Sequence, residues 1–109
     1  MPQIRTLVQL ESALAKGTFL LFLHSMACEV SVAAFSEYES WAAARPGTET
    51  GWIDADADPL VAQSASARTG VPTALPQAMF LRRGRPSWTA TDPGITQASL
   101  RSAFGWPLP

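Results

Sequence analysis

A short, unbroken run of apolar residues near the N-terminus constrains the fold most. Residues 19–24 read Phe-Leu-Leu-Phe-Leu-His, a stretch too short for a helix and without a polar residue at alternate positions. Such a run is typical of a strand that is buried on both faces, as in the middle of a partly parallel sheet. The rest of the chain must therefore supply helices that cover both faces of that sheet.

Three segments around this strand carry helical signals. Thr6 and Gln9 have the spacing of a capping box, which opens a helix running to about Lys16. Large residues recur three and four apart between residues 28 and 44, and the pattern ends at 45–47, which reads Arg-Pro-Gly. The third helix is expected over residues 59–69, with Asp58 as N-cap, Pro59 at the first helical position and Gly70 as the stop.

Further strands are predicted at residues 51–54, 77–81 and 87–91. The last two form an antiparallel hairpin around a tip at residues 82–85, where Gly84 permits a positive backbone angle. A final helix follows, capped at Ile95 and Thr96 and carrying Leu100 and Phe104. Strands that alternate with helices and end in a hairpin predict an α/β fold, with a mixed central sheet and helices on both faces, in a single domain over residues 1–109.

Charge and cysteine content exclude several classes of function. Lys and Arg total 8 against 9 for Asp and Glu, so the net charge is −1 and neither nucleic acid nor a membrane surface is an expected partner. The N-terminus lacks the basic start and long apolar block of a signal peptide, so we expect a cytoplasmic protein. The chain has one cysteine, Cys28, which excludes an internal disulfide and a multi-cysteine zinc site.

Cys28 is placed where a sulfur can be reactive, directly after the strand and at the start of the predicted helix. The first amides of a helix lack intrahelical partners and its dipole is positive there, so a thiolate is stabilised relative to a thiol of pKa about 8.5. Ser31 lies one helical turn further on, where its hydroxyl is able to donate a hydrogen bond to the sulfur. Glu29 opposes this with an adjacent negative charge, and the sequence leaves the net direction open.

Other polar residues near this point have simpler interpretations. His24 ends the strand four residues before Cys28, where it is either structural or a group that bonds to the sulfur site. Asp54, Asp56 and Asp58 imitate the opening of a calcium loop, but the glycine and the closing glutamate of such a loop are missing. We interpret them as a strand exit and a helix cap, and expect no bound metal.

Together these features resemble the thioredoxin fold with a CxxS site, over nearly the whole chain. The residues that carry the narrower resemblance are His24-Ser25, Cys28-Glu29-Val30-Ser31, Gly70-Val71, Leu75-Pro76-Gln77 and Gly84. They resemble the monothiol bacilliredoxin-like family, also called bacillithiol-system redox-active proteins. In that fold the proline matching Pro76 follows a cis peptide bond beside the active cysteine, which leaves the backbone of Leu75 free to pair with an extended substrate.

The resemblance implies a monothiol thiol-disulfide oxidoreductase, with Cys28 and Ser31 as catalytic residues and Leu75 and Pro76 as the substrate-binding segment. Its partners would be thiolated client proteins and a low-molecular-weight thiol of the bacillithiol type as co-substrate, with no tightly bound cofactor. The chain departs from the family in having Glu29 where proline is common and Ala27 where a basic residue is common.

Two alternatives belong to other classes of function. One is an iron-sulfur cluster carrier that uses Cys28 and an exogenous thiol, although Glu29 stands where such motifs normally have glycine. The other is a non-catalytic binding module of the same fold.

Overall fold

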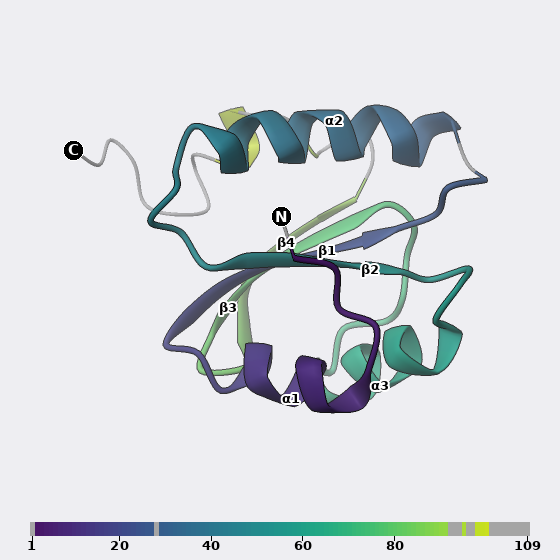
Figure 1. Cartoon of the computed structure of the whole chain (residues 1–109), viewed down its shortest axis with the longest axis vertical. Helices are drawn as coiled ribbons and strands as arrows, with labels where there is room; N and C mark the ends of the chain where they lie inside the picture. Colours follow the sequence, from purple (N-terminus) through teal and green to yellow (C-terminus); the bar gives the residue numbers. More distant parts are fainter. Residues whose placement is uncertain (1, 28, 92–94, 96–97, 101–109) are drawn as a thin grey trace.

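A four-stranded sheet in the order β2-β1-β3-β4 forms the middle layer of the molecule (Figure 1). The structure is a computed structural model that describes residues 2–27, 29–91, 95 and 98–100. Its elements in chain order are α1 (Leu7–Leu14), β1 (Thr18–His24), α2 (Glu29–Ala43), β2 (Thr50–Asp54), α3 (Pro59–Thr69), β3 (Gln77–Arg82) and β4 (Arg85–Thr91). The expected α/β fold with a mixed sheet is confirmed.

The apolar run at residues 19–24 is an inner strand, as predicted. β1 pairs in parallel with β2, where Leu23 faces Ile53, and antiparallel with β3, where Leu23 faces Gln77. Both edges of β1 are therefore hydrogen-bonded within the sheet. Because β2 runs parallel to β1 and β3 runs antiparallel to it, the carboxyl ends of β1 and β2 and the amino end of β3 lie at one end of the molecule.

Successive residues of β1 belong to two separate cores. Leu21 and Leu23 pack in the cluster shared with α1 and α3, while Leu20 and Phe22 pack in the cluster shared with α2. Figure 1 shows α2 above the sheet and α1 and α3 below it. This alternation explains why residues 19–23 of the run are all apolar, since each side chain faces a helix layer.

The predicted helix ends are largely confirmed. Thr6 and Gln9 form the capping box, and Gly70 ends α3 with φ 77°. Asp58 occupies the N-cap position before Pro59, but its side chain makes no capping hydrogen bond. The Asp58 carboxylate instead lies 3.5 Å from Arg5 Nε, so an ion pair to the segment before α1 takes the place of the expected cap.

The hairpin turn is tighter than the sequence indicates. β4 begins at Arg85, so Arg83 and Gly84 alone form the turn, with φ values of 52° and 78°. Two-residue turns with positive φ match the twist of paired strands, which favours them over the four-residue tip that we expected. Of the last predicted helix, residues 98–100 are helical and Leu100 is buried, whereas Thr96 and Phe104 lie outside the described residues.

In the described part of the chain, no helix combines the length and the apolar character needed to span a membrane.

Candidate functional site

The candidate site lies where β1 ends and α2 begins. His24 is the last residue of β1 and Glu29 the first of α2, and Cys28, between them in sequence, lies outside the described residues. The described residues on both sides are exposed: Met26 is 61% exposed and Val30 is 45% exposed. The chain around Cys28 is therefore on the surface, at the carboxyl ends of the parallel strands where α/β proteins place their sites.

Ser31, in the first turn of α2, points into the protein and is fully buried. Its Oγ accepts a hydrogen bond of 2.9 Å from the backbone N–H of Ser25. The same Oγ lies 2.8 Å from Nδ1 of His24. Ser31 therefore ties the start of α2 to the end of β1 and to the loop between them.

His24 is held among aromatic rings and is 1% exposed. Its imidazole stacks on Phe35 of α2, with ring centroids 4.4 Å apart and an interplanar angle of 19°. Trp52 of β2 meets it edge-on at 5.7 Å, and Phe22 of β1 lies 5.9 Å away. Rings from three elements thus fix the imidazole so that Nδ1 faces Ser31.

Burial lowers the pKa of His24 below its ordinary value of 6.5, because the charged imidazolium loses contact with water. Asp54, Asp56 and Glu39 oppose this shift through their negative charges, and the hydrogen bond with Ser31 also opposes it. Desolvation is the largest effect. At neutral pH the imidazole is therefore predominantly neutral, with one ring nitrogen protonated.

The loop after β1 is also tied to the loop after β2. Ser25 Oγ donates to Asp56 Oδ2 at 2.6 Å, and the backbone N–H of Ala55 donates to the carbonyl of His24 at 2.9 Å. Asp54 Oδ1 accepts the backbone N–H groups of residues 56 and 57, which closes a turn at the exit of β2. Within the described residues no group of three His, Cys, Asp or Glu is arranged to hold a metal ion.

Leu75 and Pro76 lie at the same end of the sheet. The peptide bond between them is cis, Leu75 is 39% exposed and Pro76 is buried. Gln77 pairs with Leu23, the residue before the last one of β1. Pro76, the residue before Gln77, therefore lies beside the end of β1. The Gln77 side chain holds the preceding loop by donating from Nε2 to the Pro72 carbonyl at 3.1 Å and accepting from the Ala74 N–H at 3.4 Å.

The structure thus brings together His24 and Ser31, and places Leu75 and Pro76 at the same end of the molecule. Glu29 is exposed at the first position of α2. The sequence pattern does not predict the hydrogen bonds of Ser25, Asp56 and Gln77, which fix the two loops that border the site. The contact between Ser25 and Asp56 joins residues 31 positions apart, so only the pairing of β1 with β2 reveals it, whereas the contacts of Gln77 are local.

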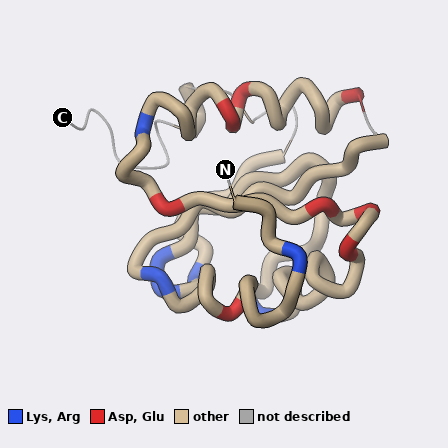
Figure 2. Tube along the Cα trace, viewed as in Figure 1, with Lys and Arg blue, Asp and Glu red and all other residues tan. Residues whose placement is uncertain are grey.

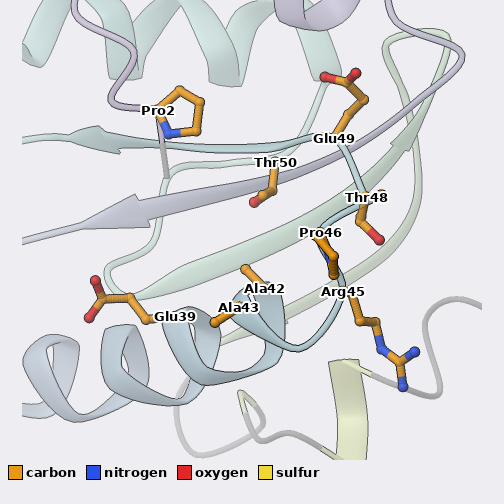
Figure 3. Close-up of a pocket in the computed structure, with 10 residues that line it drawn as sticks. Pro2, Glu39, Ala42, Ala43, Arg45, Pro46, Thr48, Glu49 and Thr50 are labelled. Carbon is orange, nitrogen blue, oxygen red and sulfur yellow. The ribbon is translucent and has the colours of Figure 1, made fainter.

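A cavity of about 530 Å³ lies at the opposite end of the molecule (Figure 3). It is bordered by the end of α2, the connection to β2 and Pro2, and Figure 3 shows Glu39, Arg45 and Glu49 around it. Its lining contains no cysteine or histidine. This cavity is therefore not a place for thiol chemistry.

A mixed sheet with β1 in its middle, a helix starting after β1, and a cis-proline before the antiparallel strand define a protein of the thioredoxin fold. One solved structure, described as having a thioredoxin fold, matches with a TM-score of 0.88 at 18% identity, over 94% of this chain and 92% of that one. Thioredoxin from Fasciola hepatica matches with 0.77 at 22% identity, over 96% and 97% of the two chains. Oxidised thioredoxin from Plasmodium falciparum matches with 0.74 at 12% identity, over 96% and 95%.

The family follows from the sequence. The model of the family described as monothiol bacilliredoxin BrxC matches residues 2–100, so the chain belongs to this family. The predicted family is thereby confirmed, and the protein is a thiol redox protein of the thioredoxin fold. Membership implies a low-molecular-weight thiol as partner. No curated protein matches the chain.

Proposed function

We propose that this protein is a monothiol thiol-disulfide oxidoreductase that removes a low-molecular-weight thiol from protein mixed disulfides through Cys28. The family indicates bacillithiol as that small thiol. The observation that carries the proposal is the match to the monothiol bacilliredoxin family over residues 2–100, a stretch that includes the chain's single cysteine.

The geometry of the described residues supports this role. A sulfur at the start of a helix is stabilised as thiolate by the free amides of the first turn, and the described helix begins at Glu29, the residue after Cys28. The neighbours Met26 and Val30 are exposed, so a disulfide can approach this part of the chain. Ser31 carries no thiol, so the enzyme needs an external one to complete its cycle.

The reaction has two exchange steps. In the first, the Cys28 thiolate attacks the small thiol's sulfur in the mixed disulfide; that bond breaks, the client leaves as thiolate, and Cys28 forms a new disulfide with the small thiol. In the second, the thiolate of another small-thiol molecule attacks this disulfide. It releases both small-thiol units as their symmetric disulfide and returns Cys28 to the thiolate, so each cycle consumes one free small thiol, frees one client thiolate and leaves the number of disulfide bonds unchanged.

The client polypeptide is proposed to dock along the segment at Leu75 and Pro76. Exposed apolar side chains stand on the three segments that meet at this end: Met26 after β1, Val30 in α2 and Leu75 before β3. Gln77 holds the loop that presents Leu75, so the docking backbone is fixed before a client arrives.

The experiment compares the wild type with the Cys28→Ser variant on a client protein carrying a radiolabelled small thiol. We expect the wild type to release label and to carry it transiently in a form that reductant removes, while Cys28→Ser does neither. Equal release by both proteins would exclude the proposed function. The Ser31→Ala variant is a matched control that keeps the nucleophile, and it is expected to retain substantial release.

A further inference from the structure

Another cavity, of about 290 Å³, lies between the ends of α1 and α3 and the turn that joins β3 to β4. Three guanidinium groups line it, from Arg68 near the end of α3, Arg83 in the turn and Arg85 directly after it. Among the described residues of the lining, Glu11 supplies the single carboxylate. β3 runs antiparallel to β1, so the turn lies beside the start of β1, at the end of the sheet opposite the candidate site (Figure 1).

The lining of this cavity carries an excess of positive charge. Glu11 of α1 forms an ion pair with Arg68 of α3. Within the described part of the chain, no carboxylate pairs with Arg83 or Arg85, and both residues are exposed. Like charges held close together repel one another, and an anion that enters between them relieves this repulsion.

The turn that presents these arginines is fixed against its neighbours. The backbone N–H of Arg83 donates to the carbonyl of Gly17 at 3.1 Å. A Cβ at Gly84 would lie 3.0 Å from the carbonyl oxygen of Leu14, so the turn packs closely against the end of α1. The backbone that carries the guanidinium groups is therefore in place before a ligand arrives, which reduces the entropy lost on binding.

Arg83 has a backbone conformation that its residue type rarely adopts. Its φ is 52°, in the left-handed region where glycine and asparagine are favoured. Two-residue hairpin turns with positive φ at both positions favour Asn-Gly, whereas this chain has Arg83-Gly84. The stability of the turn does not account for an arginine at this position, whereas a function of its guanidinium group does.

We propose that this cavity binds a small anion with two or more oxyanion groups, a phosphate ester or a dicarboxylate, between Arg68, Arg83 and Arg85. The planar guanidinium group donates paired N–H bonds that match the oxygens of phosphate and carboxylate. Arg83 and Arg85 supply the unpaired charges, while Arg68 is shared with Glu11. A volume of about 290 Å³ is at the low end for a ligand site, which favours a small molecule over a polypeptide segment.

The test titrates the full-length protein with inorganic pyrophosphate at an ionic strength of about 0.15 M, followed by the NMR shifts of the backbone amides. We expect saturable shifts confined to the ends of α1 and α3 and to the β3–β4 turn. Arg83→Gln and Arg85→Gln should each weaken binding about tenfold. A parallel titration with malonate distinguishes the two ligand classes, because the anion that binds more tightly identifies phosphate or carboxylate as the preferred group.

Arg82→Gln is the matched control, since it removes an equal charge beside the same turn. The Arg82 guanidinium lies over the ring of Phe80, 5.1 Å from its centroid, and Arg82 does not line the cavity. This variant should keep the wild-type affinity within about twofold, because only screened, long-range attraction is lost.

Arg83→Asn separates binding from the stability of the turn. Asparagine is favoured at positive φ, so this variant should resist urea better than the wild type while it binds the anion as weakly as Arg83→Gln does. Three results would overturn the proposal: neither anion gives saturable shifts, Arg82→Gln weakens binding as much as Arg83→Gln, or Arg83→Asn binds as tightly as the wild type. The site is independent of the proposed thiol chemistry, and none of these measurements uses Cys28.

Discussion

At the scale of single residues, Ser31 is instructive because it is a fully buried polar side chain with defined partners. It satisfies the backbone N–H of Ser25 and contacts Nδ1 of His24, two polar groups that the apolar interior would otherwise leave unpaired. A thiol is a weak donor and a weak acceptor and would satisfy them poorly. The serine of the CxxS pattern thus supports this loop through its contacts with Ser25 and His24.

The burial of His24 predicts how the stability of the protein depends on pH. Burial lowers the folded-state pKa below 6.5, so the unfolded chain takes up the proton first as pH falls. The free energy of unfolding should therefore decline as pH falls below 6.5, and this component should level off below the folded-state pKa. His24→Phe keeps the aromatic packing without the titration and should lack this component.

Urea unfolding at several pH values on both sides of 6.5 measures this difference. Acidic groups titrate in both proteins, so the comparison of His24→Phe with the wild type isolates the contribution of the imidazole. Identical slopes in the two proteins would show that the imidazole is not desolvated as the structure has it.

At the scale of the elements, the features that could be predicted from the sequence are those that depend on residues close together in the chain. The capping box at Thr6 and the stop at Gly70 follow from side chains within a few residues of each helix end, and the apolar run of β1 follows from burial on both faces. The sequence predicts a later start for β4 than the structure has, because Pro86 is its second residue and a proline argues against a strand unless it lies at an edge. β4 is that edge strand.

The same reasoning explains which parts of the site were predicted. The sequence predicts Ser31 in the first turn of a helix, as the structure has it, because Ser31 is only seven residues from the end of β1 at His24. Its bond with His24 and the bond between Ser25 and Asp56 were not predicted, because they depend on the angle at which α2 leaves β1 and on the register of β1 with β2. Neither quantity is encoded in a short stretch of sequence.

Three glycines allow the cost of a positive φ to be separated from the cost of a close contact. Gly47→Ala adds a methyl group in open space, and we expect a change within about 0.5 kcal/mol. Gly70→Ala also meets open space but has φ 77°, so it should cost about 1 kcal/mol. Gly84→Ala has φ 78° and would place its Cβ 3.0 Å from the carbonyl oxygen of Leu14, so it should cost the most.

The measurement is the free energy of unfolding of the three variants in urea, with Gly47→Ala as the control for the added methyl group. An equal cost at Gly70 and Gly84 would mean that the β3–β4 turn moves away from α1 without loss. That result would contradict the close approach of the hairpin to the end of α1.

At the scale of the whole molecule, the charges are divided between its two ends. Figure 2 shows blue segments gathered at the turn between β3 and β4, and red segments along the connection after β2 and at the start of α2. The acidic residues at the second end are Glu29, Asp54, Asp56 and Asp58, of which only Asp58 is described with an ion-pair partner, Arg5, while the hairpin turn carries Arg82, Arg83 and Arg85. A net charge of −1 therefore conceals a local negative field around the candidate site.

This field predicts that Cys28 discriminates between reagents by charge. An anionic alkylating agent such as iodoacetate should react more slowly with the protein than neutral iodoacetamide does, after each rate is divided by that with a free thiol. Screened charges of a few neighbouring carboxylates predict a difference of about two- to fivefold, which added salt should diminish. Glu29→Gln removes the charge next to Cys28 in sequence and should reduce the discrimination. Glu49→Gln removes an equal charge just before β2, at the far end of the molecule, and should not. If the two variants behave alike, net charge alone governs the approach of reagents and the division of charge between the two ends has no effect on the site. If Glu29→Gln alone relieves the discrimination, Glu29 also selects against anionic disulfides. Mixed disulfides on basic client segments then become the favoured substrates.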